Sequence, residues 1–130
     1  MISKATQLVV QLADRPGVLA RLCSVLGDAK VNIIAVFAPE AKDSGSVRVM
    51  VVDLPGARAA LKGAKMKFSE EEVLDVELDN RPGAFAEVAG KLAKAKINIR
   101  YAYATTAPFA RARVIIAVPD VARALVVLSK

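Results

Sequence analysis

Residues 14–22 read DRPGVLARL and residues 80–88 read NRPGAFAEV, so one short motif occurs twice, 66 residues apart. The same offset also aligns the segments before the motif. Leu8, Val10 and Leu12 are followed 66 positions later by the same three residue types. Apolar residues at alternate positions predict a strand with one buried face. The chain is therefore an internal duplication, and each half opens with a strand.

Behind each motif, apolar residues recur at helical spacing as far as Leu26 and Leu92. The pattern i, i+3, i+4, i+7 predicts an amphipathic helix in each half. In the first helix it places Leu19, Leu22 and Cys23 on the buried stripe. We therefore interpret Cys23 as a core residue and not as a reactive thiol.

The remaining elements follow in the same order in both halves. We predict strands over 31–37, 47–52 and 64–70 and a helix over 54–62 in the first half, and strands over 97–103 and 112–118 and a helix over 119–128 in the second. The order is βαββαβ over residues 1–70 and βαββα over residues 71–130, with the final strand missing. This predicts an α+β fold of two ferredoxin-like units, each an antiparallel sheet with helices on one face. The missing strand would leave the strand at 73–78 as an open edge.

Composition narrows the class of function. The chain has 130 residues, of which 55% are hydrophobic and 25% charged, so it forms a packed globular protein. We find no membrane-spanning run and no secretory cleavage pattern, and a single cysteine fits the reducing cytoplasm. The absence of histidine excludes catalytic triads and common metal sites. We therefore predict no catalytic residues, no metal and no cofactor, and a protein that is not an enzyme.

The positive net charge suggests nucleic-acid binding as an alternative function. The net charge is +6 and the pI about 9.7, which is typical of nucleic-acid-binding proteins, and Arg100, Arg111 and Arg113 could contact a phosphate backbone. Such folds bind RNA with aromatic residues on an open sheet face. Tyr101 and Tyr103 instead alternate in phase with isoleucines, which predicts that they point into the core. This speaks against nucleic acid as the partner.

The motif itself suggests ligand binding. Asp14 or Asn80 would end a strand and cap the following helix, with proline in the first helical turn. Glycine lets a ligand approach the backbone. The amides and the dipole of a helix start suit a carboxylate, while Asp or Asn oxygens suit an ammonium. An α-amino acid carries both groups, although a single copy could be no more than a well-made turn.

The apolar strand, the (D/N)-R-P-G motif and the later V-N-I or I-N-I at 31–33 and 97–99 resemble the ACT domain family. The resemblance covers nearly the whole chain as a tandem pair. It implies regulatory binding of amino acids between two units placed side by side with their second strands paired. Carried over residue by residue, it implies ligand-binding roles for Asp14, Arg15, Pro16, Gly17, Val18, Leu19, Asn32, Asn80, Arg81, Pro82, Gly83, Ala84, Phe85 and Asn98.

The two sites implied by this resemblance differ. The loop at Asp14, where many members have Asn, would face Asn98 with Arg100 beside it, because residues two apart on a strand share a face. The loop at Asn80 would face Asn32 with Ile34 beside it. Both faces of the strand at 47–52 carry apolar residues, which predicts a homodimer. We therefore expect a homodimeric amino-acid sensor that acts on a separate partner, such as a regulated enzyme, or on an operon.

Overall fold

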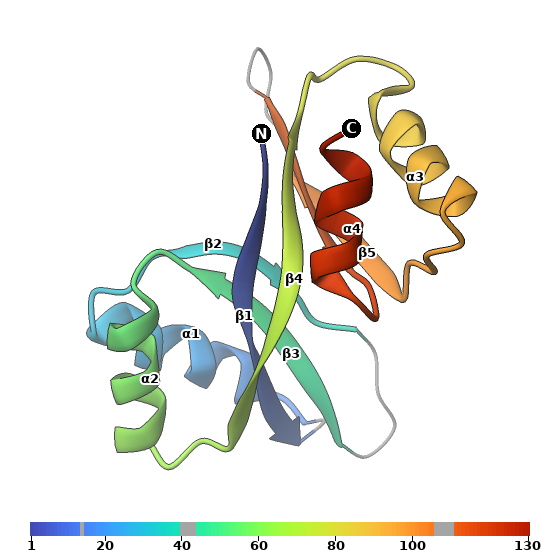
Figure 1. Cartoon of the computed structure of the whole chain (residues 1–130). Helices are drawn as coiled ribbons and strands as arrows, with labels where there is room; N and C mark the ends of the chain where they lie inside the picture. The colour runs from blue at the N-terminus through green and yellow to red at the C-terminus, as the bar shows by residue number, and fades with distance from the viewer. Residues whose placement is uncertain (14, 40–43, 106–110) are drawn as a thin grey trace. The chain divides into compact units, whose positions relative to one another are not determined.

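The computed structural model describes residues 1–13, 15–39, 44–105 and 111–130 (Figure 1). Ten elements follow one another: β1 (Ile2–Ala13), α1 (Val18–Asp28), β2 (Ile33–Phe37), β3 (Ser44–Val51), α2 (Leu54–Gly63), β4 (Phe68–Leu78), α3 (Ala84–Lys94), β5 (Tyr101–Thr105), β6 (Ala112–Ala117) and α4 (Val121–Leu128). The predicted α+β class is confirmed. None of the helices in the described part of the chain has the length and hydropathy of a membrane span.

The chain divides into two compact units. The first unit, as named here, is Gln7–Glu71. The second unit combines Glu72–Lys130 with Met1–Thr6. Both long strands, β1 and β4, therefore contribute to both units, and the predicted ranges of 1–70 and 71–130 differ from this division chiefly by Met1–Thr6.

The first unit contains the predicted ferredoxin-like sheet. β3 lies antiparallel between β1 and β2, with Leu8 opposite Val49 and Val10 opposite Val47. On the other side of β1, the Gln11 N–H donates to the Lys67 carbonyl at 2.9 Å. Alternate strand residues and both helices share one core, so α1 and α2 cover the same face. Its buried members are Leu8, Val10, Leu22, Leu26, Val31, Val47, Val49, Ala57 and Leu61.

The second unit repeats this plan with a strand taken from the start of the chain. β6 lies antiparallel between β4 and β5. The Glu77 N–H, on β4, donates to the Met1 carbonyl at 2.8 Å. Met1–Thr6 thus takes the place of the strand that follows α4 in the ferredoxin-like plan (Figure 1). The prediction that the strand at 73–78 is an open edge is wrong, because β1 lies along it.

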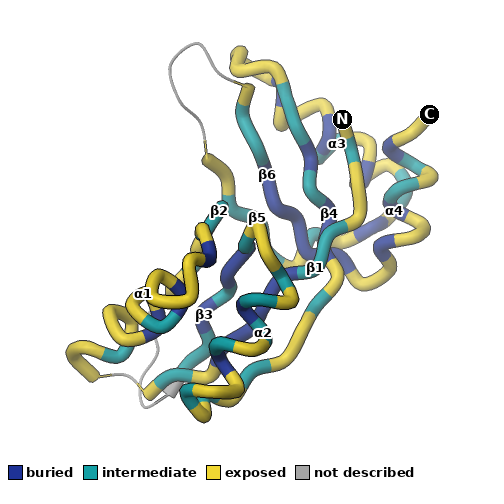
Figure 2. Tube along the Cα trace, turned by 90° about the vertical axis from the view of Figure 1, so that its left-hand side faces the viewer, coloured by how far each residue is buried: buried dark blue, intermediate teal, exposed yellow. Residues whose placement is uncertain are grey.

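The core of the second unit lies between its strands and the pair α3 and α4. In Figure 2, β6 is buried over most of its length, whereas α1 shows buried positions only at intervals. The second core comprises Leu74, Val76, Val88, Leu92, Ile97, Val114, Ile116, Val118, Val121, Ala124 and Leu128. Leu8 and Val10 in one unit, and Leu74 and Val76 in the other, belong to these cores as predicted. Gln7, Val9 and Val73 are buried as well, so the prediction of a single buried face on the opening strands is wrong.

The predicted stripe of α1 is displaced around the helix. Leu22 and Leu26 are buried, but Cys23 is exposed and Leu19 is 40% exposed. The buried positions of the equivalent helix are Ala84, Val88 and Leu92. An i, i+4, i+8 row makes a narrow stripe, and a residue one position beyond it lies about 100° around the helix. The prediction that Cys23 is a core residue is wrong for this reason.

Candidate ligand-binding sites

Both motif copies form the same backbone turn. Gly17 and Gly83 have φ angles of 91° and 85°, in the left-handed region. Each stands immediately before its helix, and its carbonyl accepts the first helical hydrogen bond, at 2.9 Å from the Arg21 N–H and 3.1 Å from the Glu87 N–H. A β-carbon would meet nothing within 4 Å at either position. Glycine is therefore required by the backbone conformation and not by crowding.

These helix starts differ from those of α2 and α4. Asp53 accepts a hydrogen bond from the Gly56 N–H at 2.9 Å, and Asp120 accepts one from the Arg123 N–H at 3.0 Å. Among the residues that the structure describes, none provides a side-chain cap for α1 or α3. The prediction that Asn80 caps α3 is wrong, and so is the placement of the prolines in the first helical turn, because each helix begins after the glycine. Asp14 lies outside the described residues. The first amides of α1 and α3 thus have no side-chain acceptor in the described part of the chain.

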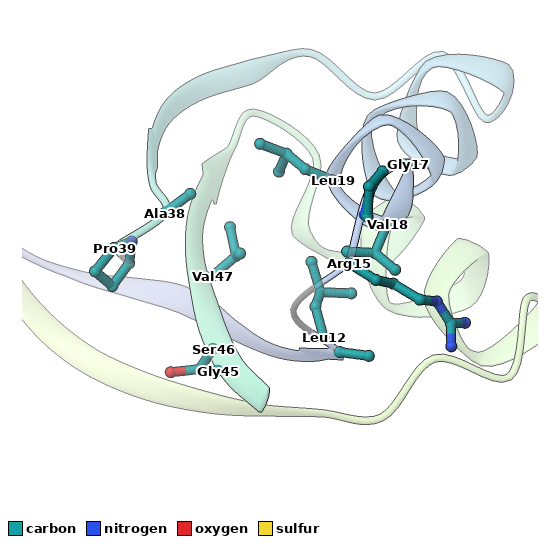
Figure 3. A pocket seen from close by; sticks show the side chains of 12 residues that line it. Leu12, Arg15, Gly17, Val18, Leu19, Ala38, Pro39, Gly45, Ser46 and Val47 are labelled. Atoms are coloured by element: carbon teal, nitrogen blue, oxygen red, sulfur yellow. The ribbon is translucent and has the colours of Figure 1, made fainter. Parts of the chain in front are cut away.

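A cavity of about 400 Å³ lies beside the turn of the first unit (Figure 3). The residues implied by the resemblance that line it are Arg15, Pro16, Gly17, Val18 and Leu19. Figure 3 shows Leu12, Leu19 and Val47 around this space, while the Arg15 guanidinium extends away from Val47 and Ala38. The sequence did not point to the other lining residues, Leu12, Ala13, Ala38, Pro39, Gly45, Ser46 and Val47. The strand pairing brings them in, since Leu12 lies opposite Gly45.

A smaller cavity of about 230 Å³ occupies the equivalent place in the second unit. Asn80, Arg81, Ala84 and Phe85 line it, as the resemblance implies, and Phe85 is 38% exposed there. The additional lining residues, which sequence reasoning missed, are Leu78, Asp79, Ala104, Thr105, Ala112 and Val114. Pro82 and Gly83 belong to the turn itself without lining this cavity. Each unit therefore has a hollow between its motif turn and the adjacent strands.

The predicted strand residues do not line these two cavities. Asn32 and Asn98 are exposed and precede β2 and β5 instead of lying on them. The pairing of β2 with β3 shifts register between Ile33 and Ala35, which is a β-bulge at Ile34. Because a bulge interrupts the alternation of faces, the argument that Ile34 shares a face with Asn32 does not hold. Asn98 instead lines a separate hollow with Ala89, Ala93, Lys96, Ile97 and Ile99.

The paired second strands expected from the resemblance are not found within one chain. The hydrogen-bonded strand order is β2-β3-β1-β4-β6-β5, so β2 and β5 are at its two ends. β2 and β5 are therefore not paired within a single chain. The expectation that the Asp14 loop faces Asn98, and that the Asn80 loop faces Asn32, stays a prediction.

Charge distinguishes the two turns. Arg81 Nη2 donates to both Glu87 carboxylate oxygens, at 2.9 and 3.0 Å. The residue equivalent to Glu87 is Arg21, and neither Arg15 nor Arg21 forms an ion pair with a described residue. The turn of the second unit is thus neutralised by its own helix, whereas the turn of the first unit carries two uncompensated cations within the described chain.

The arginines that suggested nucleic-acid binding are mostly paired. Arg111 contacts Asp79 at 2.8 Å and Arg113 contacts Asp75 at 3.1 Å. The Arg100 guanidinium carbon lies 5.9 Å from the centroid of the Tyr101 ring, within the range of a cation–π contact. These partners leave little free positive charge on this part of the second unit, which does not favour the nucleic-acid alternative.

The comparisons with known proteins agree with this geometry. A family model described as an ACT domain pair matches residues 3–127. This chain belongs to the ACT domain family. No curated protein matches this ACT domain pair.

Solved structures share its fold. The crystal structure of protein BT0572 from Bacteroides thetaiotaomicron has a TM-score of 0.91 and 29% sequence identity, over 98% of this chain and 88% of that one. The regulatory subunit of aspartate kinase from Thermus thermophilus, in its ligand-free form, has a TM-score of 0.65 and 17% identity, over 98% and 94%. The equivalent subunit from Thermus flavus has a TM-score of 0.63 and 16% identity, over 98% and 92%. The ACT domain pair therefore shares its fold with these solved structures.

Proposed function

We propose that this ACT domain pair is a regulatory amino-acid-binding protein that acts by binding and not by catalysis. The observation that carries the proposal is the contrast between the helix starts. α2 and α4 are capped by their own aspartates. α1 and α3 instead start at a left-handed glycine beside a cavity, with no side-chain cap from any described residue. A turn made twice in this form leaves helix-start amides for a ligand in both units, although the Ala84 N–H of α3 already donates to the Arg81 carbonyl at 3.3 Å.

The chemistry of an α-amino acid fits each cavity. Its carboxylate would accept hydrogen bonds from the amides that follow Gly17 or Gly83, where the helix dipole favours negative charge. Its ammonium would approach the oxygens of Asp79 and Asn80 in the second unit, and of Asp14 in the first. Leu12, Leu19 and Val47, or Phe85 and Val114, would surround the side chain. These walls favour an amino acid with an apolar side chain.

A homodimer completes the proposal. β2 and β5 are edge strands, so their backbone groups are available to a second copy in the cytoplasm. Asn32, Ile34, Asn98 and Arg100 would then approach the ligand from the partner copy. A monomeric mass in solution at micromolar concentration, together with full ligand affinity, would contradict this arrangement.

A thermal-unfolding screen against the twenty amino acids tests the function. A ligand at 100 times its Kd stabilises a protein by about 2.7 kcal/mol, which shifts the Tm of a domain of this size by several degrees. Leu19→Ala and Phe85→Ala should each reduce the shift by weakening one cavity. Val126→Ala, at an exposed position on α4, is the matched control and should leave the shift unchanged. If no amino acid at millimolar concentration moves the transition, amino-acid sensing is the wrong function.

A further inference from the structure

A second cavity lies in the first unit, across the motif turn from the one described above. Its volume is about 510 Å³. Residues of the turn, of α1 and of the segment between α2 and β4 line it. Arg15, Arg21, Lys65 and Lys67 line it, and no described lining residue is acidic. Cations from three separate parts of the chain therefore converge on one hollow.

The backbone that carries these cations is held by hydrogen bonds. Lys65 has a φ angle of 57°, and its N–H donates to the Lys62 carbonyl at 3.0 Å. The Lys67 carbonyl accepts the bond from Gln11, which ties this segment to β1. Arg21 Nη2 donates to the Ala64 carbonyl at 3.3 Å, so the guanidinium is directed from α1 toward the same segment. The cluster is positioned by contacts on α2, β1 and α1 together.

The other unit provides an internal comparison. There the residue equivalent to Gln11 is Glu77 and the residue equivalent to Arg21 is Glu87, which binds Arg81. The duplicated position is therefore self-neutralised in one unit, whereas in the other its described charged residues are all cations. Like charges in one hollow repel one another, and this repulsion destabilises the folded unit unless an anion offsets it.

We propose that this cavity binds a small, multiply charged anion, of the phosphate-ester or polycarboxylate class, as a second effector separate from the amino acid. Two guanidinium groups and two ammonium groups can neutralise several negative charges at once, and guanidinium groups bind phosphate or carboxylate in a bidentate manner. Gly17 and Val18 also line the cavity, so the uncapped start of α1 adds partial positive charge to it. Arg15 lines both cavities, and in Figure 3 its guanidinium extends away from Val47 and Ala38 of the first.

The test is a calorimetric titration of the full chain with inorganic pyrophosphate and, separately, with citrate, at constant ionic strength. Arg21→Glu copies the charge found in the second unit and should weaken binding of pyrophosphate by at least about tenfold, the loss of one charge-assisted contact. Lys94→Glu makes the same change of net charge on α3, outside the cavity, and should leave affinity within about twofold. Lys67→Gln removes one positive charge without adding a negative one. It should also weaken pyrophosphate binding, and it replaces Arg21→Glu as the test if that variant does not fold.

The outcomes separate the possibilities. Binding of both probes with the expected loss identifies a polyanion site, and a preference for pyrophosphate or citrate assigns the phosphate or the carboxylate class. Equal losses in Arg21→Glu and Lys94→Glu, or no binding of either probe to the parent chain, would overturn the proposal. So would binding of an RNA or DNA oligonucleotide in the absence of pyrophosphate binding. The proposal does not require that any amino acid binds.

Discussion

In the turn between β4 and α3, Arg81 is bound by Glu87 of the following helix, whereas the turn between β1 and α1 has Arg15 followed by Arg21 at that place. The backbones nevertheless agree, from the left-handed glycine to the hydrogen bond that opens the helix. The two copies thus share the backbone turn that the fold requires, but they differ in the charged side chains that a ligand would contact. Backbone conformation is fixed by glycine and by the core beneath it, while exposed charges at the same turn are free to diverge.

The largest expected effect tests the shared backbone. Gly17→Ala and Gly83→Ala should each lower the free energy of unfolding by about 1–2 kcal/mol, because a β-carbon disfavours the left-handed region. Gly27→Ala and Gly90→Ala are matched controls, since these glycines lie inside α1 and α3 without a positive φ. They should stabilise the protein by up to about 1 kcal/mol. Urea denaturation measures the free energy of unfolding of all four variants. A stabilising effect of Gly83→Ala would contradict the conclusion that both turns require a left-handed glycine.

The next effect tests the contrast between capped and uncapped helices. Asp53→Ala and Asp120→Ala should each cost about 1 kcal/mol, because each aspartate accepts a backbone N–H at its helix start. Asn80→Ala should leave the free energy of unfolding nearly unchanged, because α3 has no side-chain cap from a described residue. It should lower the affinity for a ligand in the second unit's cavity and leave affinity at the first unit's cavity unchanged. Chemical denaturation and calorimetric titration of the same three variants provide the two readings. A loss of stability in Asn80→Ala equal to that of Asp120→Ala would restore the capping role.

The smallest effect concerns a charge of the first unit that is paired. Arg58 Nε and Nη2 donate to the two Glu70 oxygens, both at 2.7 Å, and these hydrogen bonds hold the pKa of Glu70 below its usual value. The folded pKa lies below the unfolded one, so the contribution of this pair is present above the unfolded pKa and is lost as the pH falls through the folded pKa. Urea midpoints between neutral and acidic pH should therefore fall less steeply for Glu70→Gln than for the parent chain. Identical profiles would show that this exposed pair contributes nothing measurable.

Much of the fold could be predicted from the sequence, because the 66-residue offset repeats local patterns. Alternate apolar residues and helical spacing depend on neighbours only a few positions away, which explains why the opening strands and all four helices were predicted. The strand added by Met1–Thr6 could not be found in this way. Its partner Glu77 is 76 residues distant, and no local pattern specifies that pairing.

The candidate sites were predicted in part, for a related reason. The motif residues line or form the turns beside both cavities, because glycine and proline determine the backbone where they stand. Asn32 and Asn98 were placed on strands by their β-branched neighbours, but the strands begin later and β2 carries a bulge. Leu12 and Val47 were missed as lining residues because strand register, and not sequence proximity, brings them together.

The strand at Met1–Thr6 has a consequence for the order in which the chain folds. Gln7–Glu71 is one continuous segment, so all its contacts form within that segment, whereas the second unit must join residues from both ends of the chain. Joining ends across a long unfolded segment carries an entropy cost that slows folding. Once the first unit has formed, the bond between Gln11 and Lys67 holds its two ends together, so Thr6 and Glu72 emerge as neighbours. We therefore expect the first unit to act as a folding template for the second during synthesis.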